Sequence, residues 1–337
     1  MNVTDMVSLS TNARDCVDTP QVHLIGCPLA FASTEYAPKI WHKFEDIPAL
    51  QHPNIRWTQG SVVNVDTNGL KARIRHHNTN EETTHDYDYL IAASGLRRAF
   101  PVVPQSLTRK QYLHEASNHI RDVQASREGV VVIGGGAVGI EMAGELKLVN
   151  PELKVTLIHS RDKLLSAEPL PAECSDLTIA ALKKYGVELI LGQRVLETVE
   201  LKNNDGTIVH KVKLQNGSEL VAGRVIYAIS RSIATSSYLP SSVLNEEGQV
   251  KINNLYDCTA IPARIIFLIW RRQRFLNGAR NDERHYAIGD ISAWSAIKRC
   301  GGAIAQGTSA AENIYRQILH ERYGILPKFA ELPKYPP

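Results

Sequence analysis

The sequence predicts an α/β fold in which one architecture occurs twice along the 337 residues. Three observations lead to this prediction. An apolar run enters a glycine-rich turn at residues 130–139, a helical segment follows directly, and a strand–meander–strand order appears both before and after this turn. The length is enough for roughly two domains of ordinary size, each with its own core.

The glycine-rich turn is the first element. Residues 130–133 form a continuous β-branched run, as expected for a parallel strand buried on both faces. Gly134, Gly136 and Gly139 then follow with GxGxxG spacing. The first glycine allows a tight turn, the second lets the backbone approach a pyrophosphate, and the third lets the helix pack closely on the strand. The pattern predicts a dinucleotide site; a glycine-rich loop without a ligand is the alternative.

The helix expected at Ala137–Val149 would direct its first N–H groups, those of Ala137 and Val138 included, toward the phosphates. A second strand, residues 154–159, should follow it. This strand ends at His159, and Ser160 and Arg161 come next, where an acidic residue would bind the ribose 2′-hydroxyl of NAD. Serine and arginine suit a 2′-phosphate better, which favours NADPH. A solvated loop arginine is the other interpretation of Arg161.

The remaining elements repeat. After the second strand we expect a helix, a strand, two antiparallel strands and a closing strand, at residues 172–185, 187–191, 195–201, 208–214 and 224–230. An earlier series has the same order of strands, at residues 55–58, 61–66, 70–76 and 87–94. Gly60 matches Gly192 at an offset of 132, and Ser94 matches Ser230 at an offset of 136. This regularity predicts two Rossmann-like dinucleotide-binding domains, with two unrelated hairpins as the alternative.

The first of the two repeats lacks the glycine-rich loop with which the second begins. A glycine matching Gly134 should lie near residue 2, but residues 1–20 contain no glycine. The first domain is therefore expected to be incomplete at its N-terminus, without a phosphate-binding loop.

Four stretches resemble a known group of proteins. Residues 87–95 (YDYLIAASG), 130–146 (VVVIGGGAVGIEMAGEL), 155–165 (VTLIHSRDKLL) and 286–292 (YAIGDIS) resemble two-dinucleotide flavoproteins of the pyridine-nucleotide oxidoreductase superfamily. Within that superfamily the chain is similar to the apoptosis-inducing-factor-like flavoproteins, which are related to type II NADH dehydrogenases. The resemblance implies an NAD(P)H-binding domain inserted into an FAD-binding domain.

The resemblance also implies an activity and its residues. A hydride would pass from NAD(P)H to FAD and on to a small-molecule acceptor such as a quinone or dioxygen. Asp290, after Gly289, would bind the flavin ribityl chain, although a plain turn would also place an aspartate there. Ser94 and Gly95 lie where the chain leaves the FAD domain. Glu141 would approach the nicotinamide, or it could simply complement the helix dipole.

The last expected helix, residues 303–319, would aim its N-terminus at the pyrimidine end of the flavin. Gln306 and Lys298 are candidate neighbours of the flavin there, and a solvated helix face explains them nearly as well. The resulting domains are an N-terminal part of the FAD-binding domain at 1–122, the inserted NAD(P)H-binding domain at 123–250, and a return to the FAD-binding domain at 251–337.

An atypical insert at 261–284 departs from the family pattern, with an apolar six-residue run and five arginines. It could bind phosphate or an acidic membrane surface, form a solvated loop, or be translated non-coding sequence. With the missing FAD loop, the insert leaves an alternative function open: a non-catalytic NAD(P)-binding protein or a truncated, flavin-free gene product.

Composition excludes several other classes. The formal net charge of +3 is too small to indicate a nucleic-acid partner. Five scattered cysteines indicate a reducing compartment, and no metal-binding motif occurs. The apolar run at 265–270 is too short to cross a bilayer, and no secretory signal is visible. We therefore expect a cytoplasmic protein, with mitochondrial or peripheral membrane association left open. Nothing in the sequence indicates its oligomeric state.

Overall fold

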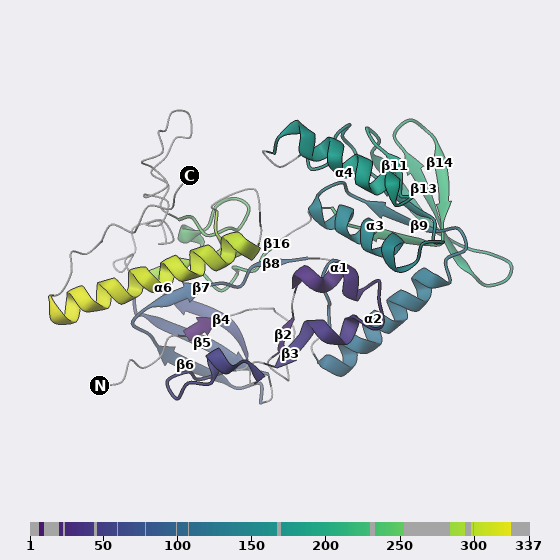
Figure 1. Ribbon diagram of the computed structural model, residues 1–337. Coiled ribbons are helices and arrows are strands. Elements are labelled where there is room, and N and C mark those ends of the chain that lie inside the picture. Colours follow the sequence, from purple (N-terminus) through teal and green to yellow (C-terminus); the bar gives the residue numbers. More distant parts are fainter. Residues whose placement is uncertain are drawn as a thin grey trace. The chain divides into compact units, whose positions relative to one another are not determined.

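The chain folds into two units, each built around a parallel sheet with an antiparallel meander beside it (Figure 1). Unit 1 comprises Met1–Val17, Pro48–Arg97 and Ser232–Pro337, and unit 2 comprises Asp18–Ile47 and Arg98–Arg231. The computed structural model describes residues 7–9, 20–22, 24–43, 46–58, 60–77, 79–98, 100–106, 108–166, 170–229, 233–252, 284–293, 298 and 300–324. The insert expected at 261–284 lies outside these residues, except for Arg284.

The parallel sheet of unit 2 has the strand order β11-β10-β9-β15. Its strands are β9 (Val130–Ile133), β10 (Val155–Ile158), β11 (Glu188–Ile190) and β15 (Arg224–Tyr227). All side chains of β9 and β10 are buried, because these central strands are covered on both faces. Helix α3 (Ala137–Val149) packs on one face through Met142, Ala143 and Leu146.

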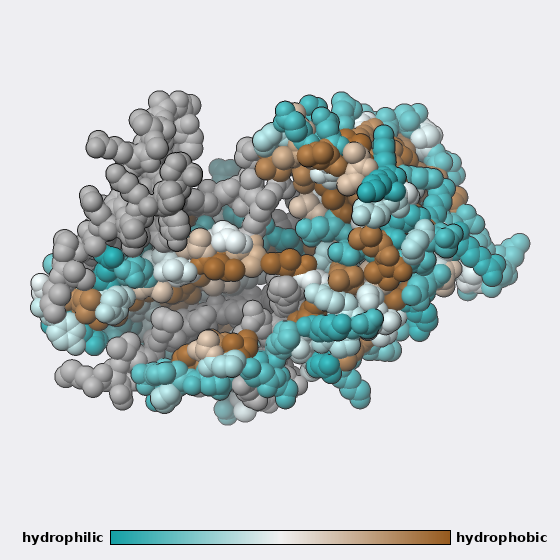
Figure 2. Space-filling model, viewed as in Figure 1, coloured by the Kyte–Doolittle hydropathy of each residue, from teal (hydrophilic) through white to brown (hydrophobic). Residues whose placement is uncertain are grey.

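Two features fix the ends of the helices in unit 2. Lys147, in the last turn of α3, donates from Nζ to the carbonyl oxygens of Pro151 and Leu153, at 2.6 and 2.9 Å. Helix α4 (Ala172–Lys184) has an acid in its first turn and two lysines in its last, as the helix dipole favours. Helices α3 and α4 keep some exposed apolar side chains, namely Leu148, Val149 and Leu177. Figure 2 shows hydrophobic areas over these two helices.

A three-stranded meander covers the other face of this sheet. It consists of β12 (Val195–Lys202), β13 (Ile208–Leu214) and β14 (Glu219–Ala222), paired in chain order. Val212, Leu214 and Ala222 pack against Val131 and Ile158 of the parallel strands. Their burial on one side explains the alternating apolar pattern of β13.

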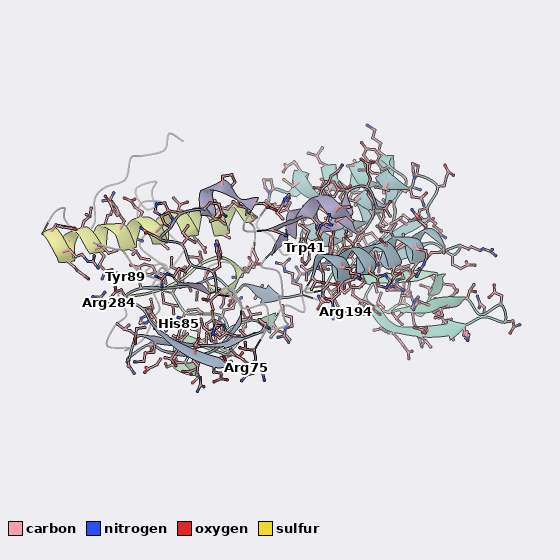
Figure 3. All side chains as sticks on the ribbon, turned by 90° about the horizontal axis from the view of Figure 1, so that it is seen from below. Trp41, Arg75, His85, Tyr89, Arg194 and Arg284 are labelled. Atoms are coloured by element: carbon pink, nitrogen blue, oxygen red, sulfur yellow. The ribbon has the colours of Figure 1, made fainter. Side chains whose placement is uncertain are left out.

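Helix α2 (Arg109–Gln124) joins a separate cluster in unit 2. Thr108 caps it by accepting from the Gln111 N–H at 3.3 Å. Tyr112 of α2 stacks on Trp41 with a centroid separation of 5.1 Å and donates to the Ala37 carbonyl oxygen at 2.7 Å. The elements around it are β2 (Pro20–Val22), η1 (Leu24–Gly26), α1 (Cys27–Ala30), η2 (Ala37–Ile40) and β3 (Trp41–Lys43), and Trp41 is labelled in Figure 3.

Unit 1 has the parallel order β1-β7-β17, formed by β1 (Val7–Leu9), β7 (Leu90–Ala92) and β17 (His285–Ala287). Its meander is β4 (Gly60–Asp66), β5 (Lys71–His76) and β6 (Glu82–Asp86). Helix α6 (Cys300–Tyr323) and the short helices η4 (Pro48–Leu50), η5 (Ser241–Val243) and η8 (Gly289–Ile291) complete it. The core joins the meander to the parallel strands through Val65, Ala72, Leu90 and Ala287.

A polar cluster attaches the end of α6 to the sheet of unit 1. The Tyr89 hydroxyl donates to a Glu321 carboxylate oxygen at 3.2 Å, and Arg284 donates to the same oxygen at 3.2 Å. The Arg284 guanidinium lies 5.0 Å from the centroid of the Tyr89 ring, and Figure 3 shows the two side chains beside each other. The fully buried Tyr286 adds a hydrogen bond to Gln317 at 3.3 Å. These contacts hold α6 in a fixed register on the strands.

Two of the four places where the chain passes between the units, 97/98 and 231/232, adjoin a pair of short strands in unit 1. Strand β8 (Leu96–Arg97) pairs antiparallel with β16 (Ile233–Ala234). Next to this pair, the Thr235 hydroxyl lies 2.6 Å from the Ser94 carbonyl oxygen and 2.8 Å from that of Gly95. The Ser94 hydroxyl donates to the Thr235 carbonyl oxygen at 2.8 Å.

The structure confirms the repeated meander and closing strand and corrects three details. Residues 55–58, expected as a strand, form no strand; Ile55 and Trp57 are exposed. A strand needs a neighbour to bond with, and none of the described sheets pairs with this segment. Each meander has a third strand, β6 and β14, that the sequence analysis did not include. The matched glycines also differ, since Gly192 has a φ of +68° whereas Gly60 lies within β4.

One histidine of unit 2 is buried without a polar partner among the described residues. His119 of α2 is 2% exposed, and neither ring nitrogen has a hydrogen-bond partner among the described residues. The rings of Phe31 and Phe100 meet its imidazole edge-on, with centroids 5.6 and 5.3 Å away. Burial, helped by the charge of Arg224, lowers the pKa of His119 to about 4, against the opposing effect of Asp122.

We therefore predict that the protein loses stability as the pH falls from 6.5 toward 4. In this range the unfolded state takes up a proton that the folded state excludes, at a cost of up to about 3 kcal/mol. Chemical denaturation at several pH values measures this loss. The variant His119→Phe keeps the aromatic contacts and should remove this component. An unchanged pH dependence in that variant would contradict the assignment.

Candidate functional site

The glycine-rich loop before α3 is held by a close backbone approach. Gly134 has a φ of +125° and donates its N–H to the Ile158 carbonyl oxygen at 2.9 Å. A Cβ at Gly134 would lie 2.5 Å from the Ala228 carbonyl oxygen, and one at Gly139 would overlap the Gly134 carbonyl oxygen. The first and third glycines therefore let α3 start directly against the sheet, as their spacing predicts.

Gly136, between these two, faces open space. It is the N-cap of α3 and receives no side-chain cap, and nothing lies within 4 Å of the position of a Cβ. The first intrahelical bond runs from the Ile140 N–H to the Gly136 carbonyl oxygen, at 3.1 Å. The N–H groups of Ala137 and Val138 come before this bond and have no acceptor within the helix. Together with the helix dipole, they form a cradle that fits the phosphates of a dinucleotide.

The residue after β10 is bonded to the glycine loop. His159 accepts at Nδ1 from the Gly135 N–H at 3.1 Å, and its Nε2 lies 3.1 Å from the Ser166 hydroxyl oxygen. An Nδ1 that accepts carries no proton, so in the neutral ring the proton is on Nε2, which donates to Ser166. Partial burial lowers the pKa of His159, and the charge of Arg161 adds to this effect. The site thus presents an uncharged ring where many dinucleotide-binding proteins have an acid.

Ser160 and Arg161 are both exposed next to this ring. The Arg161 guanidinium donates to the Ser166 carbonyl oxygen at 2.9 Å, which keeps its positive charge over the loop after β10. The structure therefore brings His159, Ser160 and Arg161 to the same end of the sheet as the glycine loop. Gly135 and Ser166, which hold this arrangement, were not among the residues singled out from the sequence. The signal available for Gly135 was its place as the middle glycine of the GGG triplet.

A second cluster of expected residues lies in unit 1, where η8 meets the start of α6. The Gly289 N–H donates to the Gln306 side-chain oxygen at 2.6 Å, and the Ser292 hydroxyl donates to the Gly289 carbonyl oxygen at 2.8 Å. Lys298 donates from Nζ to the Ser292 carbonyl oxygen at 2.5 Å. Burial lowers the pKa of Lys298, while the nearby Asp290 acts in the opposite direction.

The first turn of α6 leaves room for a ligand. Gly301 and Gly302 are exposed, and no atom of the described residues lies within 4 Å of a Cβ placed on either. Asp290 is half-buried in η8, which packs on α6. The helix begins at Cys300, three residues before the start expected from the sequence.

Three other expected residues lie elsewhere. Glu141 is exposed on α3, beyond its first turn. Ser94 and Gly95 bond with Thr235 at the paired connections, and the Ser94 hydroxyl is also 3.1 Å from that of Tyr238. The roles of these three residues toward a cofactor stay predictions.

Strand β1 occupies the place of β9 in the first copy. It pairs in parallel with β7, as β9 does with β15. A phosphate-binding loop would follow β1, yet residues 10–19, STNARDCVDT, include no glycine. Those residues lie outside the described part of the chain, so the absence of a loop there stays a prediction from the sequence.

The sheet orders and the glycine loop define the class: a protein with two Rossmann-like dinucleotide-binding domains. The chain belongs to the pyridine nucleotide-disulphide oxidoreductase family, whose model matches residues 11–267. Oxidoreductase OXR1 of Ajellomyces capsulatus is 48% identical over 316 residues, covering 94% of this chain and 65% of that protein. Ferroptosis suppressor protein 1 of Mus musculus is 34% identical, over 58% of this chain and 51% of that protein.

Solved structures share the fold. The water-forming NADH oxidase from Lactobacillus brevis, bound to NADH, superposes with a TM-score of 0.62 at 17% sequence identity. That alignment covers 88% of this chain and 62% of the oxidase. The present chain thus spans between about half and two thirds of the length of these relatives.

Among the described residues, no helix is long and apolar enough to cross a membrane. The same residues contain no group of three or more histidine, cysteine or acidic side chains placed to hold a metal ion. The cytoplasmic location expected from the sequence stays a prediction.

The close approach of Gly139 to the Gly134 carbonyl oxygen leads to a prediction about stability. The variant Gly139→Ala must push α3 away from the Gly134 carbonyl oxygen, so we expect a loss of at least about 2 kcal/mol of unfolding free energy. Gly144→Ala, in the same helix with open space around its Cβ, should instead stabilise by about 0.5–1 kcal/mol. Urea denaturation measures both. Equal effects of the two substitutions would show that the close approach is not a constraint.

Proposed function

We propose that this protein is an FAD-dependent NAD(P)H oxidoreductase that delivers electrons to a small-molecule acceptor. The observation that carries the proposal is the uncapped N-terminus of α3, with open space at Gly136 and backbone N–H groups that lack an acceptor within the helix. Membership of the pyridine nucleotide-disulphide oxidoreductase family supports the redox chemistry. The name of OXR1, an oxidoreductase, agrees with it.

The residues of unit 2 would bind and orient NAD(P)H. Gly134, Gly136 and Gly139 shape the loop, while Ala137 and Val138 donate to the pyrophosphate. None of the residues 159–161 carries a carboxylate, so these three residues would not repel a 2′-phosphate. Arg161 and Ser160 supply a positive charge and a hydroxyl donor instead. We therefore propose that NADPH binds at least as well as NADH.

The residues of unit 1 would hold the flavin end of FAD. Asp290 and Gly289 would bind its ribityl chain, and the first turn of α6 would face its ring system, with Gln306 and Lys298 nearby. Lys298 is held by the Ser292 carbonyl oxygen and keeps a positive charge close to Asp290. A bound flavin supplies the capacity to accept a hydride and release electrons singly or in pairs. Among the described residues there is no second glycine loop for the adenine end.

The acceptor and the domain limits are part of the proposal. A quinone or dioxygen would suit the flavoproteins that the chain resembles, and the oxidase from Lactobacillus brevis is named as water-forming. We propose 1–122 and 251–337 as the FAD-binding domain and 123–250 as the inserted NAD(P)H-binding domain, limits that differ from the two compact units at residues 18–47, 98–122 and 232–250. Glu141 would lie on the nicotinamide side of α3, and Ser94 and Gly95 would border the flavin where the chain leaves that domain.

Gly136 allows binding to be tested apart from folding. Its backbone is extended, with φ −82° and ψ 177°, so Gly136→Ala adds no backbone strain and should change stability by less than about 0.5 kcal/mol. The added methyl group would occupy the cradle and weaken binding of NADPH and NADH by about tenfold or more. Isothermal titration calorimetry gives both dissociation constants, and Gly144→Ala is the matched control. Unchanged affinity in Gly136→Ala would refute the proposed phosphate site.

Flavin content distinguishes the two candidate functions. A flavoprotein should purify yellow, or become so on addition of FAD, and NADPH should bleach its visible absorbance under anaerobic conditions. A spectrum before and after heat release of the cofactor quantifies occupancy. A colourless protein that binds NADPH and does not retain added FAD would instead be the non-catalytic NAD(P)-binding protein.

A further inference from the structure

The end of β10 combines three features around one titratable ring. His159 accepts the Gly135 N–H at Nδ1, donates from Nε2 to Ser166, and lies on the loop that carries Arg161. The ring packs directly over Gly135, where a Cβ would meet the imidazole Cγ at 2.6 Å. It thus lies between the phosphate loop and the segment that discriminates between ribose substituents.

Among the described residues, few charged groups lie around this ring. The loop before α3 presents the backbone of Gly135, and the segment after β11 presents the Ile190 carbonyl oxygen and the Gln193 N–H to the His159 backbone. On the ring's own loop, Arg161 is a cation and Asp162 is an anion whose carboxylate lies against Gly192. Arg161 is the charge that acts on the imidazole.

We propose that His159 makes the preference of the site for NADPH over NADH depend on pH, with the neutral ring accepting both cofactors and the protonated ring favouring the 2′-phosphate. This inference rests on the proposed NAD(P)H site. It concerns the regulation of that site by an imidazole that can gain a proton as the pH falls.

The hydrogen bonds show what protonation changes. A protonated Nδ1 can no longer accept the Gly135 N–H, so this bond is lost and the ring gains a second donor. The loop itself stays attached, because the Gly135 carbonyl oxygen accepts the Leu165 N–H at 2.9 Å and the Gly134 N–H bonds to Ile158. The released imidazolium and Arg161 then form a pair of cations for which a phosphate dianion is the fitting ligand.

Thermodynamic linkage gives the expected change in cofactor preference, and it also predicts proton uptake when NADPH binds. A hydrogen bond to a charged group exceeds a neutral one by about 1.4 kcal/mol, so the ratio of the NADH to the NADPH dissociation constant should rise about tenfold upon protonation. If NADPH binds the protonated ring better, its binding must also raise the pKa of His159 and take up a proton. NADH, which lacks the 2′-phosphate, should cause no such uptake.

The experiment measures dissociation constants of NADPH and NADH for the full chain between about pH 8 and about pH 5.5 at constant ionic strength. Calorimetry in buffers of different ionisation enthalpy adds the number of protons taken up. The 2′-phosphate itself titrates near pH 6, with a pKa of about 6. His159→Asn corrects for this, because its amide oxygen can accept the Gly135 N–H but the side chain cannot be protonated.

A matched control is His210→Asn. His210 lies on β13 in the same unit, and burial also lowers its pKa. We expect wild type and His210→Asn to show the rise in the ratio and the proton uptake, and His159→Asn to show neither. Identical pH profiles in wild type and His159→Asn would overturn the inference, with NADPH binding intact. Failure of wild type to bind either cofactor at any pH would instead refute the proposed function.

Discussion

The contact between Gly139 of α3 and the carbonyl oxygen of Gly134 is the constraint on which the candidate site depends. No side chain fits there, so the helix starts within van der Waals distance of the strand that precedes it. This closeness directs the first N–H groups of α3 to the edge of the sheet where β9, β10 and β15 end. It also leaves Gly136 facing open space. The geometry is therefore suited to a ligand that carries phosphates.

In unit 2, strand β10 is followed by a histidine, His159, at a position where many dinucleotide-binding proteins have an acid. An acid after β10 would repel a 2′-phosphate, whereas His159 is neutral when it accepts the Gly135 N–H. The neutral imidazole thereby joins the end of β10 to the glycine loop by a hydrogen bond and adds no charge at this position. Arg161, anchored by Ser166, supplies the permanent positive charge. We propose that selectivity for a 2′-phosphate at this position depends on these hydrogen bonds.

Parts of the fold could be predicted because they follow from local pattern. The buried run at 130–133, the glycine spacing and the helix Ala137–Val149 were all predicted with their observed bounds, since each has a strong periodic or steric signature. The prediction of a strand at 55–58 was wrong, because a strand forms only beside a partner strand and a local pattern does not show whether one is present. Strand β6 was missed since its polar, exposed sequence resembles a loop, and β14 was missed since its four residues are too few for a clear periodicity.

The sequence by itself determined the class of protein, the glycine loop and the identity of the residues after β10, because these depend on residue types at fixed spacing. Only the tertiary structure decided that residues 18–47 join unit 2, that Gly135 and Ser166 hold His159, and that Gln306 bonds to the Gly289 N–H. Those contacts link residues between 7 and 24 positions apart, or whole segments, and no local periodicity encodes them. They arise when strands and helices pack, since packing places polar groups where they must find partners.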